Sequence, residues 1–159
     1  MRLITTLFLM MVMAGTLAGQ EKPFQYNGNG HVYFSSGVCQ HGYKHIGAGG
    51  GGGAFLWRGL TLGGSAGYHQ FVDDFGFGLA SLDVGYHFTD RKRPKRFDPF
   101  VNLSPVGVVF ASGAAGTGGV GGGVNYWFKE RLGLRTEVRV QVIGVEESVV
   151  MFRIGVNFR

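Results

Sequence analysis

The sequence predicts an all-β fold, in which eight antiparallel strands run up and down in chain order and close into a barrel. Glycine supplies 30 of the 159 residues and proline only 4, which is more glycine than a helical bundle contains. No helical periodicity follows residue 20, whereas apolar and polar residues alternate with a period of two in several segments. Residues typical of turns separate these segments, so the pattern indicates consecutive β-hairpins.

The start of the chain differs in composition from the rest. Arg2 precedes an apolar stretch, and small residues follow that stretch. This order is typical of a secretory signal peptide, with cleavage expected after Ala18. We therefore expect residues 1–18 to be a signal peptide and residues 19–159 to form one exported domain. Cys39 is the only cysteine, so neither a lipidated cysteine at the cleavage site nor an intrachain disulfide is expected.

Eight segments have the length of strands and are bounded by turn signals. They cover residues 24–37, 43–57, 60–71, 77–89, 97–111, 117–129, 132–143 and 148–159. The turn signals are Arg58-Gly59, Asp73-Asp74, residues 91–95 around Pro94, Ser112-Gly113, Lys129-Glu130, and Gly144 to Ser148. Each segment is long enough to cross a bilayer, which takes a strand of about 9–11 residues. Pro105 cannot donate a ladder hydrogen bond and the alternation changes phase beside it, which predicts a β-bulge in the fifth strand.

The last two strands show the alternation most clearly. In segment 132–143, leucine, threonine and valine occupy one face, while Arg135, Glu137 and Arg139 occupy the other. The apolar face of the final segment consists of Val150, Phe152, Ile154, Val156 and Phe158. Its other face contains Arg153. Two consecutive strands therefore share one apolar face and one charged face.

The direction of the apolar face decides between a soluble barrel and a membrane barrel. Aromatic residues gather where the even-numbered strands end, at Leu56-Trp57, Tyr86, Phe88, Tyr126-Trp127-Phe128 and Phe158. Such a rim is typical of the interfacial girdle of a membrane barrel. The strand positions that alternate with these apolar positions carry polar and charged residues. They are Arg135, Glu137, Arg139, Arg153, Asp83, His69 and His87. These charges would be expensive in an apolar core, so we expect them to face a polar lumen and the apolar face to meet lipid.

These features resemble a known family. The export signal, the hairpins rich in glycine and aromatic residues, and the final strand MFRIGVNFR are similar to the small outer-membrane β-barrel domain family, which is eight-stranded and porin-superfamily-like, over residues 20–159. The resemblance implies a location in the cell outer membrane and insertion by the barrel assembly machinery. In that family the last strand ends in an aromatic residue that the machinery reads. Phe158 matches this signal but is penultimate, because Arg159 follows it.

The inward charges predict a network inside the barrel. With the last turn centred near residue 146, Arg139 faces Arg153 and Glu137 faces Gly155. Like charges directly opposite each other destabilise a sheet, so a carboxylate is needed between them. We therefore expect a lumen charge network of Arg135, Glu137, Arg139 and Arg153. An eight-stranded barrel is just wide enough for side chains to fill, and Trp127 and His87 are expected to share the lumen.

Two motifs suggest chemistry but have simpler explanations. The run Gly49–Gly53 matches a dinucleotide fingerprint only formally, because no helix is expected after it. We expect these glycines to make room for bulky aromatic residues of a neighbouring strand. The possible hydrolase residues are His31, Ser35, His45, His69 and Ser81. They show no convincing spacing with a fixed acid, so no catalytic, cofactor or metal site is expected.

The chain carries a formal net charge of +5 at pH 7, concentrated in one turn. That turn contains Arg91, Lys92, Arg93, Lys95 and Arg96. It is either a solvated turn or a contact with anionic headgroups or cell-wall polymers. Export excludes a nucleic-acid partner, and we expect a monomer in contact with outer-membrane lipids. The function expected is structural or adhesive. The alternatives are a lipid-modifying barrel enzyme and a soluble exported barrel that binds an apolar ligand.

Overall fold

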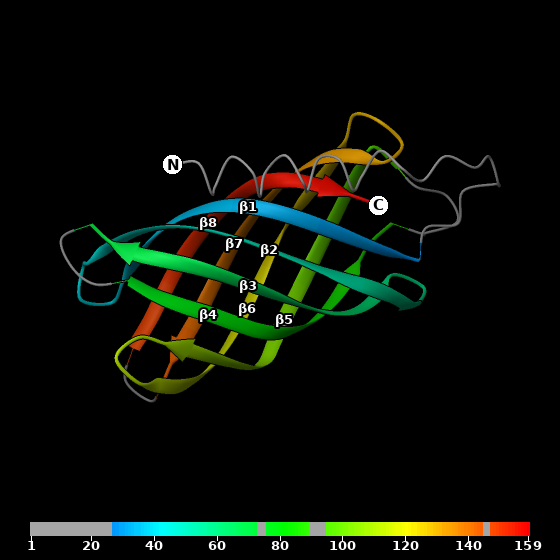
Figure 1. Cartoon of the computed structure of the whole chain (residues 1–159). Coiled ribbons are helices and arrows are strands. Elements are labelled where there is room, and N and C mark those ends of the chain that lie inside the picture. Colours follow the sequence, from blue (N-terminus) through cyan, green and yellow to red (C-terminus); the bar gives the residue numbers. More distant parts are fainter. Residues whose placement is uncertain (1–26, 73–75, 90–94, 145–146) are drawn as a thin grey trace, which may run out of the picture.

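The computed structural model describes residues 27–72, 76–89, 95–144 and 147–159, so the predicted signal peptide lies outside the described residues. Eight antiparallel strands form one closed barrel in chain order, as predicted (Figure 1). The strands are β1 (Gly28–Cys39), β2 (Lys44–Trp57), β3 (Leu60–Phe71), β4 (Gly76–His87), β5 (Phe97–Phe110), β6 (Ala114–Trp127), β7 (Leu132–Ile143) and β8 (Glu147–Phe158). In the described part of the chain, no helix is long and apolar enough to cross a bilayer.

Several predicted strand boundaries were wrong by two or more residues, among them the end of the first strand and the start of the sixth. The first strand continues to Cys39 because Gly42 adopts a φ of +84°, which allows a tight turn to Lys44. The sixth strand begins at Ala114 and not at residue 117, because Phe110 still pairs with Ala114. The alanines and glycines of this stretch show no polar alternation, but backbone hydrogen bonds do not require it.

The predicted bulge at Pro105 is confirmed. On β4, Leu82 pairs with Val106 and Val84 with Leu103, so one residue of β4 faces two residues of β5. Pro105 and Val106 both point outward, and the inward alternation resumes at Gly107. The bulge therefore keeps the apolar side chains of β5 on the outer face on both sides of the proline.

A second irregularity lies in the turn between β2 and β3. The pairing shifts between Phe55 and Trp57, so Phe55 is buried inside while Trp57 is exposed outside. Arg58 and Gly59 follow with φ angles of +40° and +93°. Two successive positive φ values are typical of a type I′ hairpin turn.

The barrel has two rims, which we name for the chain ends. The terminal rim is where β1 begins and β8 ends, and the turn Arg58-Gly59 lies there (Figure 1). The distal rim holds the connections 40–43, 72–75, 111–113 and 144–146. Exposed aromatic residues ring the terminal rim, at Trp57, Tyr86, Phe88, Phe97, Tyr126, Phe128 and Phe158. Trp127 is the exception in the predicted rim, because its side chain is only 3% exposed and lies inside the barrel.

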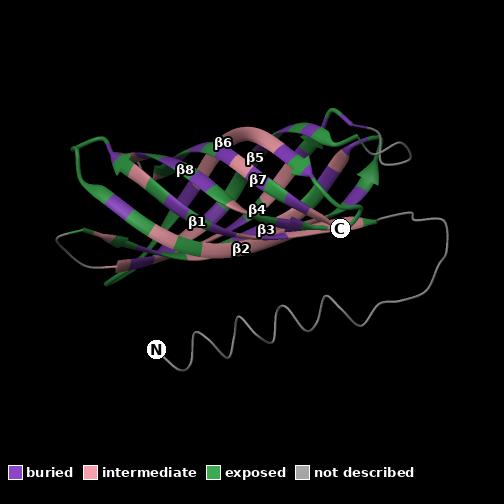
Figure 2. Ribbon diagram, turned by 90° about the horizontal axis from the view of Figure 1, so that it is seen from above, coloured by how far each residue is buried: buried purple, intermediate pink, exposed green. Residues whose placement is uncertain are grey.

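Buried and exposed residues alternate along the strands (Figure 2). The row predicted on β8 faces outward, since Val150, Phe152, Ile154, Val156 and Phe158 are all exposed. The inward side is polar in the middle of the barrel and apolar near the distal rim. The apolar part, which we call the distal plug, consists of Cys39, Phe77, Leu79, Val109, Val149 and Met151. The side-chain directions are therefore those of a membrane barrel, as the charge pattern predicts.

The glycine-rich strand β2 gives the lumen space for large side chains of its neighbours. A Cβ atom on Gly49 would lie 2.6 Å from the hydroxyl oxygen of Tyr33 on β1, and one on Gly51 would lie 3.0 Å from the ring of His31. A Cβ on Gly47 would meet the ring of His69 on β3 at 2.5 Å. The run is part of a strand and leads into a hairpin. The steric explanation is confirmed for Gly49 and Gly51, whereas Cβ atoms on Gly50, Gly52 and Gly53 would first meet backbone oxygens of the neighbouring strands.

Candidate functional site

The candidate site is the polar middle of the lumen, and its centre is on β7. Arg135, Glu137 and Arg139 occupy alternate positions of this strand, so their side chains all point inward. All three are buried, and Glu137 is only 1% exposed. A carboxylate so deeply buried needs several donors, because the free energy of removing it from water is large.

Glu137 obtains these donors from three residues. Its Oε1 accepts hydrogen bonds from Arg139 Nε at 2.8 Å and from Asn102 Nδ2 at 2.9 Å. Its Oε2 accepts from Arg135 Nη2 at 3.0 Å and from Arg135 Nε at 3.2 Å. The two arginines therefore lie on either side of one carboxylate, which compensates both charges and fixes both guanidinium groups.

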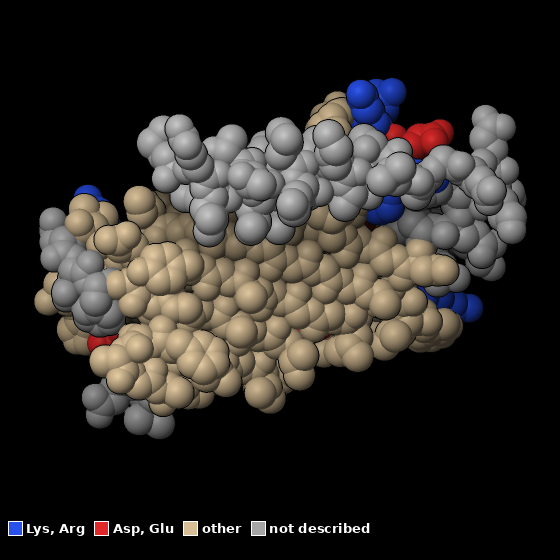
Figure 3. All heavy atoms as spheres, viewed as in Figure 1, with Lys and Arg blue, Asp and Glu red and all other residues tan. Residues whose placement is uncertain are grey.

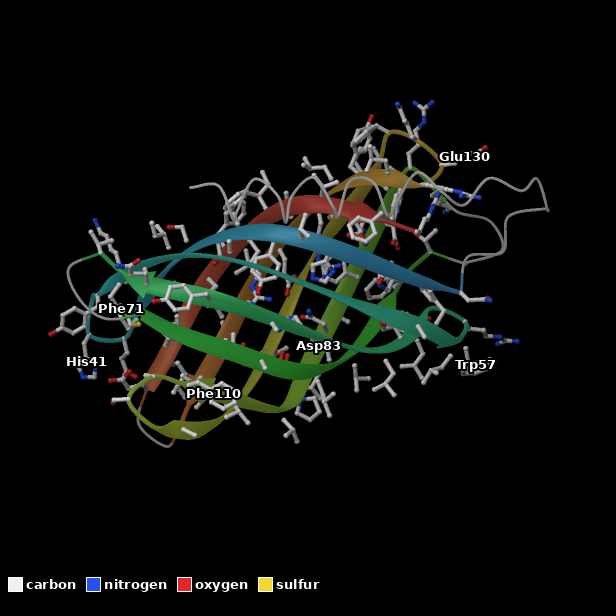
Figure 4. The ribbon with its side chains drawn as sticks, in the orientation of Figure 1. His41, Trp57, Phe71, Asp83, Phe110 and Glu130 are labelled. Carbon is white, nitrogen blue, oxygen red and sulfur yellow. The ribbon has the colours of Figure 1, made fainter. Side chains whose placement is uncertain are left out.

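A second carboxylate, Asp83 on β4, completes this arrangement from across the lumen (Figure 4). Arg139 Nη1 donates to Asp83 Oδ1 at 3.2 Å and to Ser104 Oγ at 3.1 Å. The Ser104 hydroxyl also donates to Asp83. The parity of β4 predicts that Asp83 faces inward. Its pairing with Arg139 has no signal in the sequence, because the two residues are 56 positions apart.

The register predicted for the last hairpin was wrong by two residues. Glu137 faces Arg153, and Arg139 faces Met151. Strand β8 begins at Glu147, one residue earlier than predicted, and Gly144 adopts a φ of +63° after β7 ends. A positive-φ glycine is typical of the short connections that set such a register. The shift preserves the inward parity and removes the pair of opposed arginines.

Arg153 stands apart from the rest of the predicted network. It is 1% exposed, yet it makes no ion pair with a described residue. Its guanidinium lies 4.4 Å from the ring centre of Tyr33 on β1, a cation–π contact, and its Nη2 lies 4.0 Å from Met151 Sδ. Its Nε and Nη1 have no hydrogen-bond partner among the described residues. Three of the four predicted residues are thus in direct contact, and the fourth turns toward β1.

The network continues toward the terminal rim through an amide. Arg135 Nη1 donates to Asn125 Oδ1 at 3.4 Å, and Asn125 Nδ2 donates to Asp98 Oδ2 at 3.1 Å. The same Asp98 oxygen lies 2.8 Å from His87 Nδ1. Sequence reasoning placed His87 in the lumen but missed its partner. Hydrogen bonds therefore connect β4, β5, β6 and β7 without interruption from Asp83 to His87.

The side chains considered for catalysis are dispersed through the lumen. Ser35 Oγ lies 3.3 Å from His69 Nδ1, which is the geometry of a nucleophile beside a base. No carboxylate among the described residues hydrogen-bonds to His69, and its Nε2 has no partner there. Ser81 instead bonds to Ser65 and Asp83. The described residues also contain no group of three histidine, cysteine or acidic side chains arranged to hold a metal ion.

The lumen contains a small cavity on the terminal side of the network. Its volume is about 40 Å³, and its lining includes His31, Thr61, Asn102 and Arg135. A water molecule needs roughly 10–15 Å³ of such space, so the cavity has room for only a few waters. On the distal side the plug follows. The arrangement suits a hydrogen-bonded interior better than a site for a substrate-sized molecule.

The predicted assembly signal lies at the seam between the last strand and the first. Phe158 is exposed on the outer face, and its ring covers Gly30 of β1, where a Cβ atom would collide with it. Arg159 turns away from the outer face, since its guanidinium lies 4.2 Å from the ring centre of Trp127 and its Nε donates to Glu130 O at 2.6 Å. Phe158 is therefore the last outward side chain of β8.

Known proteins with this architecture were found by structure and not by sequence. No family model matches the chain, and no curated protein matches its sequence. Neisserial surface protein A superposes with a TM-score of 0.65 at 14% identity, covering 84% of this chain and 97% of that one. The N-terminal β-barrel domain of Pseudomonas aeruginosa OprF gives 0.60 at 22% identity, covering 83% and 98%. Ail, the attachment invasion locus protein of Yersinia pestis, gives 0.59 at 10% identity, covering 84% and 99%.

These similarities extend over the whole of each neighbour's barrel. The chain therefore has the fold of the small eight-stranded outer-membrane β-barrels, and the family resemblance predicted from its sequence is confirmed at the level of the fold.

Proposed function

We propose that this protein is a monomeric integral outer-membrane β-barrel with a structural or adhesive role and without enzymatic activity. One observation carries the proposal: apolar side chains face outward around the barrel while the buried residues of its middle are charged. A soluble barrel has the opposite arrangement, because its apolar side chains must be removed from water. The soluble ligand-binding alternative required the apolar face to point inward, and Ile154 and its row point outward.

The proposed lumen is closed to ions. The distal plug and the network around Glu137 leave a cavity of only about 40 Å³, which supports this part of the proposal. Recordings across planar bilayers should show no large, stable open state. Stable channels of porin conductance would contradict a closed lumen.

A structural role is better supported than an adhesive one. The four connections of the distal rim contain only three or four residues each, which leaves little surface for a protein partner. One structural neighbour is named as an attachment protein, which keeps adhesion as the second candidate. Binding of intact cells to host-cell monolayers, compared with a deletion strain, separates the two roles.

The absence of catalysis is supported by the environment of the Ser35–His69 pair. His69 is fully buried, and its ring stacks on Phe77 of the distal plug. A lipid acyl ester that enters from the distal rim would have to pass the plug to reach the pair. We also propose that the barrel assembly machinery inserts the chain and reads Phe158. No cofactor is part of this proposal.

The test of the proposed location is fractionation of the native host. The protein should be recovered with outer membranes and should migrate differently on a denaturing gel before and after boiling. An intact barrel resists the detergent until it is heated, because its strands pair without a free edge. Recovery in the soluble periplasm without detergent would contradict the proposal.

A further inference from the structure

The charges outside the lumen are distributed unequally between the two rims. The terminal rim carries six described cations, Arg58, Lys95, Arg96, Lys129, Arg131 and Arg159. Glu130 is the acidic residue among the described residues there. At the distal rim, the described residues include one lysine, Lys44, and one acid, Glu147. Between the rims the visible wall is almost free of charge (Figure 3).

Arg58 shows that a cation is present where the backbone does not favour it. Its φ of +40° lies in the left-handed region, which costs a non-glycine residue free energy and favours asparagine or glycine. The arginine side chain is exposed and lies over Trp57, with its guanidinium carbon 5.0 Å from the ring centre. The turn geometry therefore gains nothing from arginine, and its charge and its contact with Trp57 are what the residue contributes.

The cations lie next to an aromatic girdle. Trp57, Tyr86 and Tyr126 are exposed at the same rim as the basic residues. Amphipathic aromatic residues mark the boundary between hydrocarbon and headgroups. A cation just beyond this boundary lies at the depth of the lipid phosphates, where an anionic surface attracts basic residues.

We infer that the terminal rim binds the phosphate groups of anionic glycerophospholipids in the periplasmic leaflet. The inference rests on the proposed function, since it requires a membrane barrel. The partner is identified by charge complementarity between the rim and the lipid headgroups, and no pocket is involved. The rim would hold a ring of anionic lipids around one end of the barrel.

The number of strands and the distal charges identify the leaflet. Because the barrel has an even number of strands, β1 begins and β8 ends at the same rim, the terminal rim. A chain that enters from the periplasm as hairpins must carry only the distal connections across the hydrocarbon. Moving a charge through the bilayer is expensive. The sequence has five charges in and beside the distal connections, Lys44, Asp73, Asp74, Glu146 and Glu147, against eleven in the terminal connections and at Arg159. The basic rim can therefore stay on the side of entry, where glycerophospholipids form the leaflet.

The two tryptophans permit a direct test. Trp57 is 65% exposed at the terminal rim, whereas Trp127 is 3% exposed inside the lumen. The protein is folded into vesicles of equimolar phosphatidylglycerol and phosphatidylcholine, with bromine on the acyl chains of one lipid or the other. Only Trp57 can contact the quencher. Quenching by the brominated anionic lipid should exceed quenching by brominated phosphatidylcholine severalfold, given roughly fivefold attraction per basic residue near an anionic surface.

Neutral variants determine whether the rim cations cause the preference. A quadruple variant combines Arg58→Asn, Lys95→Gln, Arg96→Gln and Lys129→Gln, and it should lower the quenching ratio clearly, although Arg91, Lys92, Arg93, Arg131 and Arg159 remain at this rim. A triple variant that keeps Arg58 should lower it in part and leaves the environment of Trp57 unchanged. Lys44→Gln at the distal rim is the matched control and should leave the ratio as it is. High salt should act like the quadruple variant, because it screens exposed charges.

The possible failures are distinguishable. Folding into pure phosphatidylcholine vesicles, followed by the shift on heating, tests the proposed membrane barrel without any anionic lipid. A protein that folds there but shows a quenching ratio of one overturns the inference alone. A ratio that persists in the quadruple variant also overturns it. If lipopolysaccharide displaces brominated phosphatidylcholine from Trp57 and phosphatidylglycerol does not, the assigned leaflet is wrong.

Discussion

The interior faces of β4 to β7 and of β8 to β3 line the same lumen, but their polar groups are satisfied to different degrees. On the first side, Asp83, Glu137 and Asp98 accept hydrogen bonds from arginine, asparagine, serine or histidine. The second side contains most of the buried side-chain N and O atoms that have no hydrogen-bond partner among the described residues. They belong to His31, Tyr33, His45, His69, Arg153 and Asn157.

The difference follows from the sequence of the strands. The first side has acids and arginines at inward positions of β4, β5 and β7, so charges compensate each other across the lumen. The second side has glycines at inward positions of β2, and histidine and tyrosine rings of β1 and β3 occupy the space they leave. One side is therefore held by directional electrostatic contacts and the other by packing of rings. Removing a single group should have unlike effects on the two sides.

The largest effect is expected for Glu137→Ala on the networked side. The change leaves Arg135 and Arg139 buried beside an empty position, which should lower the free energy of unfolding by about 3–5 kcal/mol. Denaturant unfolding in lipid vesicles measures it. Gln141→Ala is the control on the same strand, because its loss of one hydrogen bond to Thr117 should cost about 1 kcal/mol. Equal midpoints for the two variants would show that the network does not stabilise the barrel.

A charge on the outer wall should affect both sides equally. Ile154→Arg on β8 and Val138→Arg on β7 each place arginine near mid-strand on an outward position, at a cost of about 2–4 kcal/mol. Val142→Arg is closer to the distal rim and should cost less, because the penalty depends on depth. Folding yield in vesicles reports the three variants. A harmless Ile154→Arg would mean that this face does not meet lipid.

Arg153→Met should change the stability little, by about 1 kcal/mol in either direction. Arg153 has no carboxylate partner among the described residues, so its replacement by an apolar side chain of similar length leaves no charge uncompensated. The matched variant Arg139→Met removes the partner of two carboxylates and should cost about 3–5 kcal/mol. A large loss for Arg153→Met would show that the second side also depends on charge.

The smallest effect on stability is expected at the seam where the two sides meet. Phe158→Ala removes a ring that covers Gly30 across β1 and β8, and such a contact contributes about 0.2–1 kcal/mol. Insertion into the outer membrane of living cells should slow much more than folding into vesicles. Phe152→Ala is the control, because it is outward on the same strand but not terminal. Equal insertion rates for the two variants would exclude Phe158 as the assembly signal.

Parity could be predicted from the sequence and pairing could not. A period of two determines the face of every residue in a strand, which is why the inward positions of Arg139, Asp83 and His87 were predicted correctly. The register of β7 and β8 depends on the last turn. An error of two residues there leaves each side chain on its correct face but changes its partner, which is why Arg153 was predicted opposite Arg139 although it pairs with Glu137. Parity also separates Trp127 from its outward neighbours, although all three are aromatic.

Contacts across the lumen carry no sequence signal at all. Arg139 reaches Asp83, while Arg153 turns to Tyr33. These choices depend on strand tilt and on the space left by neighbouring side chains. The bulge at Pro105 was predictable because proline removes a donor from the ladder. The boundary at Ala114 was not, since alanine and glycine show no alternation.

The accessibility of the Cys39 thiol reports on barrel closure. Its thiol is the only one in the chain, and in the folded barrel it is buried in the distal plug. The plug draws residues from β1, β4, β5 and β8, so the thiol is shielded only after the first strand has met the last. The pairing of β1 with β8 joins the strands that are furthest apart in the sequence, so its loop closure has the largest entropic cost. During folding, the time at which the Cys39 thiol stops reacting with an alkylating reagent therefore reports when the open sheet closes into a barrel.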